Sequence, residues 1–188
     1  MEKINESKKL TRECITTALL LLIEEKPYEK ISISEITEKA GVSRMAYYRN
    51  YSDKDDILLS YIIETENSFL NSIVDQSLTF RQMIIEAGRF FHRSSDVLNI
   101  ADKLPVSKRI FSELSANLFS FFPQINYSSR LGYMASFYAG AIISVFRTWL
   151  ENGACESVEE IADIICDNVS VELITYYDKA ISTGDFSH

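Results

Sequence analysis

The stretch SISEITEKAGVSRMAYYRNYSDK, residues 32–54, predicts two short helices joined by a sharp turn. Ser32 and Glu35, three residues apart, form a capping box, in which each side chain accepts a hydrogen bond from the other residue's backbone amide. Gly41 then supplies a positive φ, a conformation that residues with a Cβ atom resist. The first helix should therefore begin after Ser32 and end at the glycine.

A second helix is expected directly after this turn. Ser43 is a good N-cap, and the residues that follow it, RMAYYRN at positions 44–50, are expected to be helical. Two helices joined by about 3–4 residues that include glycine are typical of a helix-turn-helix, whose second helix enters the major groove of DNA. The sequence therefore predicts a DNA-binding element here.

The composition is that of a globular protein, with 188 residues of which 46% are hydrophobic and 24% charged. The N-terminus is polar, and the apolar run 18–23 is far shorter than the ~20 residues of a membrane span, so we expect a cytoplasmic protein. Three scattered cysteines and two histidines do not have the spacing of a zinc site, so no metal and no cofactor are expected. The chain shows no glycine-rich phosphate loop and no nucleophile motif, which makes an enzyme the least favoured class.

The charge is divided unevenly along the chain. The net charge of −8 argues at first against binding to DNA. Residues 1–54, however, carry ten basic and nine acidic residues, whereas residues 55–188 carry nine basic and eighteen acidic residues. The excess of acid therefore lies outside the helix-turn-helix, and the first segment keeps basic groups that phosphates can meet.

Apolar residues recur at helical spacing through the rest of the chain, and no stretch alternates as a strand would. We therefore expect an all-α protein with an N-terminal three-helix helix-turn-helix domain in residues 1–54 and a larger helical domain in residues 55–188. Proline and glycine set several helix ends, since Pro27 and Gly153 stop helices and Pro105 opens one. The expected helices span residues 6–26, 54–75, 79–94, 105–123, 127–152 and 157–181.

The last two helices differ in their patterns. Residues 130–150, RLGYMASFYAGAIISVFRTWL, are apolar on almost every side, which predicts a helix buried all round. Residues 157–181 begin with a second capping box, made by Ser157 and Glu160, and carry one apolar and one acidic side. We expect this last segment to be one continuous helix.

The run ISISEITEKAGVSRMAYYRNYSDKDDIL, residues 31–58, resembles the N-terminal domain of the tetracycline-repressor family of bacterial regulators. The segment TREC at residues 11–14 is also similar, and the resemblance covers about residues 8–60. It implies a homodimer that binds a short palindromic operator and is usually released by a small ligand. It also implies that the larger helical domain serves ligand binding and dimerisation. Met45 and Ala46 depart from the residues common in the family, so a base preference cannot be carried over.

The resemblance places Tyr48 at the family's phosphate-binding tyrosine and Lys54 at its backbone-binding lysine. Arg44 is the best candidate for a base edge, because its planar fork matches the two acceptors of guanine. Met45 and Ala46 are candidates for contact with a thymine methyl group. The alternative is that these residues form an ordinary solvated surface. The full set of predicted DNA-binding residues is Thr11, Ser32, Ser43, Arg44, Met45, Ala46, Tyr48, Arg49, Asn50 and Lys54.

A small helical DNA reader gains specificity by pairing, with two recognition helices roughly 34–36 Å apart. The two C-terminal helices are the expected dimer surface. Small residues recur every four positions in the first of them, which would let another helix approach closely. The alternative is close packing inside one subunit. The candidate interface residues are Gly132, Ser136, Gly140, Ser144, Ile161 and Ile165.

Aromatic residues gather in the middle and last thirds of the chain. An apolar cavity lined by aromatic rings with few polar groups is typical of a small-molecule site, although aromatic residues at helical spacing are more often plain core. The resemblance implies a pocket in this domain, which would suit a small apolar or aromatic effector. The candidate pocket residues are Phe90, Phe111, Phe137 and Trp149.

The sequence thus predicts a ligand-responsive dimeric transcriptional regulator, most simply a repressor. A ligand would bind better to the form whose recognition helices are wrongly spaced, and so shift the population off DNA. Two alternatives remain open. In the first, the protein is an activator or co-activator of the same fold, which only the position of the operator relative to a promoter distinguishes from a repressor. In the second, the protein is a helical interaction module that does not bind DNA. This alternative predicts no salt-dependent binding to duplexes.

Overall fold

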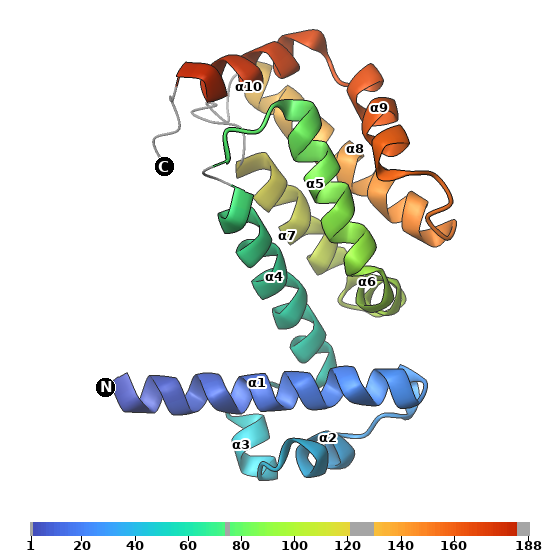
Figure 1. Ribbon diagram of the computed structural model, residues 1–188. Helices are drawn as coiled ribbons and strands as arrows, with labels where there is room; N and C mark the ends of the chain where they lie inside the picture. The colour runs from blue at the N-terminus through green and yellow to red at the C-terminus, as the bar shows by residue number, and fades with distance from the viewer. Residues whose placement is uncertain (1, 74–75, 121–129, 184–188) are drawn as a thin grey trace. The chain divides into compact units, whose positions relative to one another are not determined.

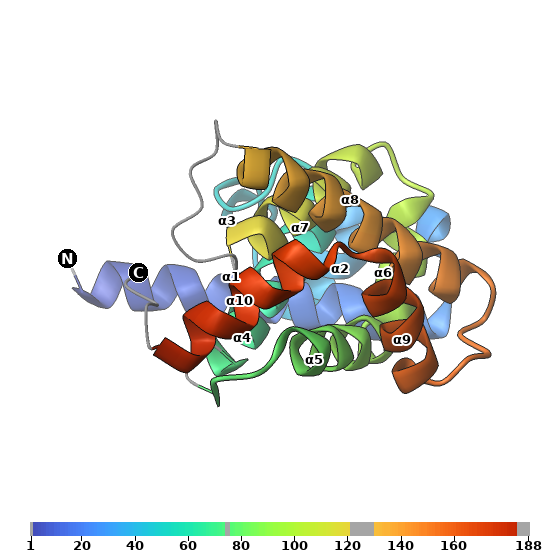
Figure 2. The same ribbon diagram turned by 90° about the horizontal axis from the view of Figure 1, so that it is seen from above.

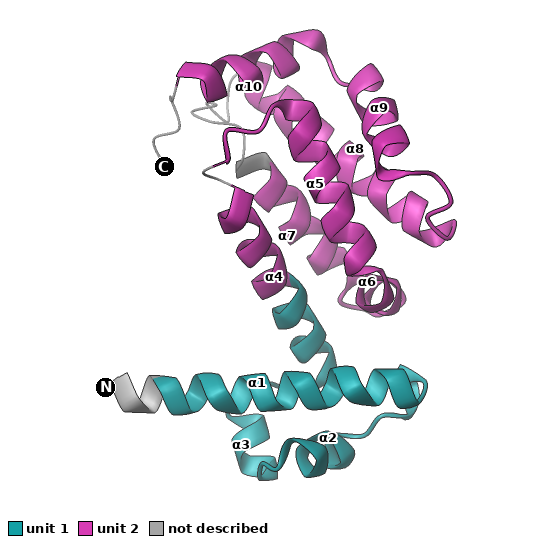
Figure 3. Ribbon diagram, viewed as in Figure 1, with its two compact units in different colours: residues 1–62 teal, residues 63–188 magenta. Residues whose placement is uncertain are grey.

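The computed structural model describes residues 2–73, 76–120 and 130–183, and every regular element within these ranges is a helix (Figure 1). The all-α prediction is therefore confirmed for this part of the chain. Two compact units are present, Met1–Ile62 and Ile63–His188 (Figure 3). The division falls within α4 (Lys54–Ile73), so one helix begins in the first unit and ends in the second. The boundary drawn from the sequence lies at the start of that helix.

The first unit is built on its long N-terminal helix. It contains α1 (Glu2–Glu25), the 3-10 turn η1 (Tyr28–Lys30), α2 (Ile33–Ala40) and α3 (Arg44–Tyr48). The helices α2 and α3 both pack against α1 (Figure 1). α1 begins earlier than the expected residue 6, and it ends before Pro27 as predicted.

The core of the first unit forms where these three helices meet. Ile15 of α1, Ile36 of α2 and Tyr47 of α3 are fully buried. Tyr51 is 4% exposed, and its hydroxyl lies 3.3 Å from the Oγ1 atom of Thr16. Both tyrosines therefore belong to the core of the first unit. Because Tyr47 anchors one side of α3, the other side of this helix is left to solvent.

The second unit contains the end of α4 and a bundle of further helices. They are α5 (Phe80–Arg93), α6 (Ser95–Asp102), α7 (Ser107–Ser120), α8 (Arg130–Glu151), α9 (Val158–Asn168) and α10 (Val171–Thr183). α9 packs against both α5 and α8, and α7 packs against α8 (Figure 2). Phe80, Met83, Phe146 and Leu173 are fully buried at the centre of this unit.

The C-terminal segment corrects one prediction. The expected single helix over residues 157–181 is two helices, because the backbone of Val169 is extended, with φ −83° and ψ 141°. Ser170 then restarts the helix, since its Oγ atom accepts a hydrogen bond of 3.2 Å from the amide of Leu173. The capping box of Ser157 and Glu160 is present, as predicted.

Other helix ends agree with the sequence only in part. Gly153, with φ +83°, follows the end of α8, and α7 begins two residues after Pro105. The expected end of the helix over 105–123 at Pro123, the expected start of the next helix at Tyr127 and the last two residues of the helix over 54–75 lie outside the described residues.

α8 is not buried on all sides, which is a second correction. Tyr133 and Phe137 are each 69% exposed, although Ala135, Ile142 and other residues of the helix are buried. The sequence pattern was misleading because aromatic residues on the outer side are as apolar as those on the inner side. α8 therefore presents an apolar surface that the described residues leave uncovered.

α5 and α9 approach each other closely at Gly88. A Cβ atom built on this glycine would lie 2.8 Å from Cγ1 of Val158 and 3.3 Å from Cε1 of Phe146. A separation of 2.8 Å between carbon atoms is well inside van der Waals contact. The absence of a side chain at this position is therefore what allows the two helices to pack here.

None of the helices within residues 2–73, 76–120 and 130–183 has the length and hydropathy that a membrane crossing requires.

Candidate nucleic-acid interface

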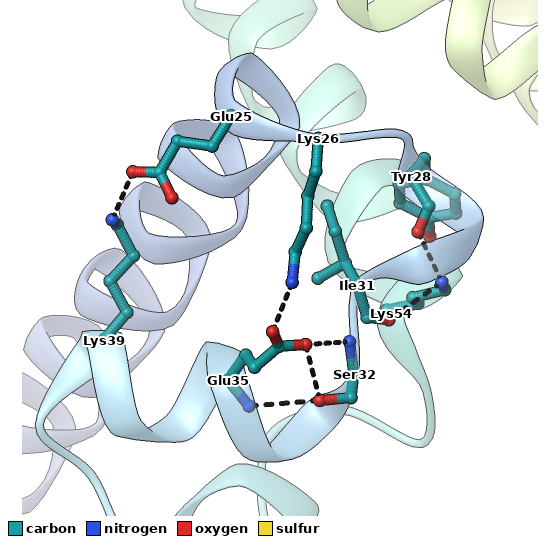
Figure 4. A network of polar contacts seen from close by, with 8 residues as sticks. All are labelled: Glu25, Lys26, Tyr28, Ile31, Ser32, Glu35, Lys39 and Lys54. Carbon is teal, nitrogen blue, oxygen red and sulfur yellow. Dashed lines mark hydrogen bonds and ion pairs between the residues drawn. The ribbon is translucent and has the colours of Figure 1, made fainter.

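The turn between α2 and α3 has the geometry that the sequence predicts. The capping box is formed, with the amide of Ser32 donating to Oε2 of Glu35 over 3.0 Å and the amide of Glu35 donating to Oγ of Ser32 over 3.3 Å (Figure 4). Gly41 ends α2 with φ +66° and ψ +28°. This left-handed conformation turns the chain toward α3, and glycine adopts it without a steric cost.

Glu35 also joins α2 to the end of α1. Its carboxylate accepts a hydrogen bond from the ammonium group of Lys26 in addition to those from Ser32 (Figure 4). The hydrogen bond from Lys26, followed by those from the side chain and backbone of Ser32, lowers the pKa of Glu35 to about 2. A second ion pair, 2.7 Å between Nζ of Lys39 and Oε1 of Glu25, ties the same two helices together.

Lys54 has a structural position that the sequence did not indicate. Its Nζ atom donates to the carbonyl oxygens of Tyr28, over 2.7 Å, and Ile31, over 3.1 Å (Figure 4). The ammonium group also lies 4.3 Å from the centre of the Tyr28 ring. Two of its three N–H donors are thus used by backbone carbonyls of the first unit.

Tyr28 completes this contact between η1 and α4. Its hydroxyl donates to Oδ1 of Asp55 over 2.7 Å. Burial, followed by the hydrogen bond to Asp55, raises the pKa of the Tyr28 phenol above its ordinary value. The start of α4 is therefore fixed to the turn that precedes α2.

α3 carries the predicted recognition residues. Ser43 caps it, because its Oγ atom accepts a hydrogen bond of 3.1 Å from the amide of Ala46. The helix is shorter than the predicted span 44–50, since it ends at Tyr48 and the next residues form a turn. Asn50 lies in that turn, and its Nδ2 atom donates to the carbonyl of Ala46 over 2.8 Å.

The solvent side of α3 contains four of these residues, namely Arg44, Met45, Tyr48 and Arg49. Met45 is 66% exposed and Tyr48 is 57% exposed, although both are large and mostly apolar. Large apolar side chains on a surface, next to two cations, indicate a binding face. Neither arginine is paired with a carboxylate of the described residues.

The two arginines have different neighbours. Nη2 of Arg44 donates to the Oγ atom of Ser34 on α2 over 2.8 Å, whereas Nη2 of Arg49 is 3.4 Å from the Sδ atom of Met45 on its own helix. The sequence did not indicate this hydrogen bond to Ser34, because it joins residues of two different helices. Thr11, the predicted residue on α1, is half-buried, and its hydroxyl donates to the carbonyl of Ser7 over 2.8 Å.

The four predicted pocket residues of the second unit have different surroundings. Phe90 is buried and stacks on Phe69, with ring centroids 4.9 Å apart. Trp149 is buried and donates from Nε1 to the carbonyl of Glu156 over 3.1 Å, whereas Phe137 is on the surface. Phe111 lines a cavity formed chiefly by α6, α7 and α8, to which Phe91 of α5 also contributes.

This cavity has a volume of about 50 Å³ and is partly open to solvent. Its rim carries Arg147, which pairs with Asp102 over 2.8 Å and with Glu151 over 3.0 Å. Its walls are apolar and are formed chiefly by Phe91, Leu98, Ile110, Phe111, Leu114, Ile143 and Leu150.

A buried acid on α4 was also missed. Glu66 is 4% exposed and accepts a hydrogen bond of 2.7 Å from Nδ2 of Asn117. Burial raises the pKa of Glu66 to about 7; the hydrogen bond from Asn117 opposes this shift, and the nearby charge of Glu113 adds to it. The sequence held a signal, since Glu66 lies four residues after Ile62 on the buried side of the helix.

The predicted interface residues fall into two groups. Gly132 is buried, and Ile161 and Ile165 are 5% and 3% exposed, so these three are used inside the subunit. Ser136 and Ser144 are exposed, and a Cβ atom built on Gly140 would meet no heavy atom within 4 Å. These last three residues therefore belong to the same uncovered surface of α8 as the two exposed aromatic residues.

Comparison with known sequences gives matches in both units. Residues 15–61 match the profile of the family described as bacterial regulatory proteins, tetR family, and residues 96–170 match that of a transcriptional regulator C-terminal region. The nucleoid occlusion factor SlmA of Alteromonas mediterranea is 32% identical over 107 residues, which cover 54% of this chain and 50% of that protein. The match thus extends over about half of the relative's length.

Solved structures share the fold. A TetR transcriptional regulator from Streptococcus agalactiae superimposes with a TM-score of 0.61 at 18% identity, covering 90% of this chain and 98% of that one. The dihydroxyacetone kinase operon activator DhaS superimposes with a TM-score of 0.60 at 19% identity, covering 90% of this chain and 96% of that one. At these identities the likeness concerns the fold alone.

Proposed function

Because this chain belongs to the TetR family of bacterial transcriptional regulators, we propose that it is a dimeric repressor whose binding to a palindromic operator is relieved by a small molecule. The observation that carries the proposal is the exposed face of α3. Arg44, Met45, Tyr48 and Arg49 are exposed on a helix whose opposite side is anchored by the buried ring of Tyr47. Such a face fits the major groove, where a helix presents side chains to base edges.

The residues of this face have different roles in the proposal. Tyr48 donates its phenol to a phosphate oxygen, and the remaining N–H of Lys54 does the same at the start of α4. Arg44 reads a guanine, and Met45 and Ala46 contact a thymine methyl group. Further backbone contacts are assigned to Thr11, Ser32, Ser43, Arg49 and Asn50.

We assign the dimer contact to the uncovered surface of α8, with the neighbouring C-terminal helices at its edge. Tyr133 and Phe137 supply exposed apolar area there, and the open space at Gly140 gives a second helix room to approach. Ile164 of α9 and Val171 of α10 are 49% and 77% exposed. A two-fold axis at this surface would give two recognition helices, which must lie roughly 34–36 Å apart to meet successive turns of the groove.

The cavity between α6, α7 and α8 is the candidate effector site. Its volume of about 50 Å³ is small beside the ~300–1,000 Å³ of typical ligand pockets. A ligand must therefore separate these helices and disturb the ion pairs of Arg147 at the rim. Since such a ligand binds the opened form better, it shifts the population toward that form. Moving the ratio of two forms from 1:99 to 99:1 requires about 5.5 kcal/mol of differential binding.

An activator is the second candidate function. The solved structure named as an operon activator, DhaS, has the same fold over 90% of this chain, so the architecture is compatible with activation as well as repression. The two functions differ in where the operator lies. An operator that overlaps the promoter favours repression, and one upstream of the promoter favours activation.

Selection of bound duplexes from a random pool tests the proposal. We expect enrichment of a sequence with two-fold symmetry, and an affinity for it that falls steeply as salt rises. Tyr48→Phe should weaken binding to every duplex, whereas Thr175→Ala, a hydroxyl removed from an exposed position of α10, serves as the matched control. Enrichment of no duplex, or binding that does not depend on salt, would refute DNA binding.

A further inference from the structure

The hydrogen bond between Ser34 and Arg44 connects the two helices of the helix-turn-helix. Ser34 lies in the first turn of α2, and its Oγ atom accepts a hydrogen bond of 2.8 Å from Nη2 of Arg44, the first residue of α3. α2 is itself held firmly, because Glu35 next to the serine is bonded to Lys26 and Ser32. Ser34 thus offers a fixed acceptor to a side chain on the other helix.

Arg44 depends on this contact for its orientation. The first turn of α3 contains no acidic residue, and no carboxylate of the described residues pairs with Arg44. An arginine side chain has many rotamers, and fixing it only when DNA binds costs entropy at that moment. A partner that orients the guanidinium before binding removes part of this cost.

Arg49 provides a contrast within the same face. Its Nη2 atom is 3.4 Å from the Sδ atom of Met45, which lies on its own helix. A thioether sulfur is a weak acceptor, whereas a hydroxyl oxygen is a good one. Of these two arginines, Arg44 is therefore the one held by a strong acceptor from a separate helix.

The chemistry of the acceptor matters as much as its position. A guanidinium group has five N–H donors, of which Ser34 takes one, and guanine offers two acceptors, O6 and N7, to a pair of them. The hydroxyl is neutral, so it leaves the positive charge of Arg44 intact. A carboxylate at the same position would neutralise that charge and occupy two donors at once.

We propose that Ser34 is a positioning residue that sets base preference by holding the Arg44 guanidinium ready to bind a base edge. This inference rests on the proposed function, since it requires that α3 reads DNA. It assigns Ser34 to specificity, acting through Arg44, and gives it no contact of its own with the nucleic acid.

The test compares four full-length proteins: the wild type, Ser34→Ala, Arg44→Ala and the double variant. Duplexes selected by the wild type identify the base pair whose preference Arg44→Ala removes, by about 5- to 150-fold. Ser34→Ala should lower the preference at that same base pair by about two- to tenfold. The double variant should show no further loss beyond Arg44→Ala, because Ser34 acts through the arginine.

Two controls separate positioning from a merely structural role. Ser34→Thr keeps a hydroxyl at the position and should restore the preference. Thr17→Ala, which removes an exposed hydroxyl from α1, should leave it unchanged. Thermal unfolding of Ser34→Ala should coincide with that of the wild type, since both partners are exposed.

Three results would overturn the inference. They are an unchanged base preference in Ser34→Ala, a loss that is equal for all duplexes, and losses that add in the double variant, which would mean that Ser34 contacts DNA directly. If the wild type itself enriches no duplex, the proposed function fails first, and the inference falls with it. The behaviour of the wild type thus distinguishes the two failures.

Discussion

Glu66 of α4 and Asn117 of α7 form a hydrogen bond of 2.7 Å inside the second unit, where the glutamate is 4% exposed. A carboxyl group in such a position is neutral more readily than it is charged, because burial disfavours the ionised form. The titration of Glu66 should therefore make the stability of the second unit depend on pH.

The first prediction concerns stability against pH. The pKa of Glu66 is about 7 in the folded chain and its ordinary value is 4.5, so between these values the folded state holds more protons than the unfolded state. The stabilising contribution of the neutral acid is complete below pH ~4.5, is lost as pH rises toward about 7, and amounts to about 3 kcal/mol. Glu66→Gln should abolish this loss in urea unfolding at fixed protein concentration.

The control for this prediction is Glu172→Gln, at an exposed position of α10. Its unfolding free energy should follow the wild-type dependence on pH. If the free energies of unfolding of the wild type and Glu66→Gln changed in parallel from pH 4.5 to pH 8, the burial of the Glu66 carboxyl group would be contradicted.

The second prediction concerns Gly88. Gly88→Ala places a Cβ atom 2.8 Å from Cγ1 of Val158, a short β-branched side chain that cannot move far. Overpacking should cost about 1–3 kcal/mol, against a gain of about 1 kcal/mol from helix propensity. We expect a lower free energy of unfolding. The matched change in α8, Gly140→Ala, meets no atom within 4 Å and should leave subunit folding intact.

The third prediction separates two roles of Lys54. Lys54→Met removes the ammonium group that binds the carbonyls of Tyr28 and Ile31, so the first unit should lose about 1–3 kcal/mol of stability. If its remaining N–H also meets a phosphate, the slope of log affinity against log salt should fall by about 1. Tyr48→Phe is the contrasting variant, since an exposed phenol can be removed without a change in melting temperature. Wild-type stability of Lys54→Met would be inconsistent with the hydrogen bonds described.

The fourth prediction tests the surface of α8. Phe137→Glu puts a charge on a ring that is 69% exposed, so the subunit should fold normally. A dimer that buries this position should dissociate about 100-fold more readily, because an unpaired charge would be removed from water. Sedimentation equilibrium measures the change. Ser112→Glu, at an exposed position of α7, is the control, and equal dimerisation of the two variants would place the interface elsewhere.

Local chemistry explains what was predictable from the sequence. The capping boxes at Ser32 and Ser157, and the left-handed turn at Gly41, depend on residues within a few positions of one another. The same holds for the burial of Tyr47, which lies on the side of α3 that packs against α1. These features sufficed to indicate the helix-turn-helix and the all-helical fold.

Contacts between distant residues explain what was not predictable. Lys54 binds carbonyls some twenty-five residues away, at spacings of 26 and 23 positions, and no local pattern specifies such a contact. The break at Val169 is hidden because Ile165, Val169 and Leu173 remain on one helical spacing across it. The four predicted pocket residues have different surroundings, because aromatic spacing does not reveal which rings face one another.

The hydrogen bonds from Lys26 and Ser32 to the Glu35 carboxylate determine how this contact responds to acidic pH. With a pKa of about 2, Glu35 stays ionised well below pH 4.5, the ordinary pKa of its side chain. The clamp between α1 and α2 therefore persists during acid stress, and with it the placement of Ser34 above α3. Under the proposed function, any loss of DNA binding at acidic pH should then originate in groups that titrate closer to neutrality, outside this clamp.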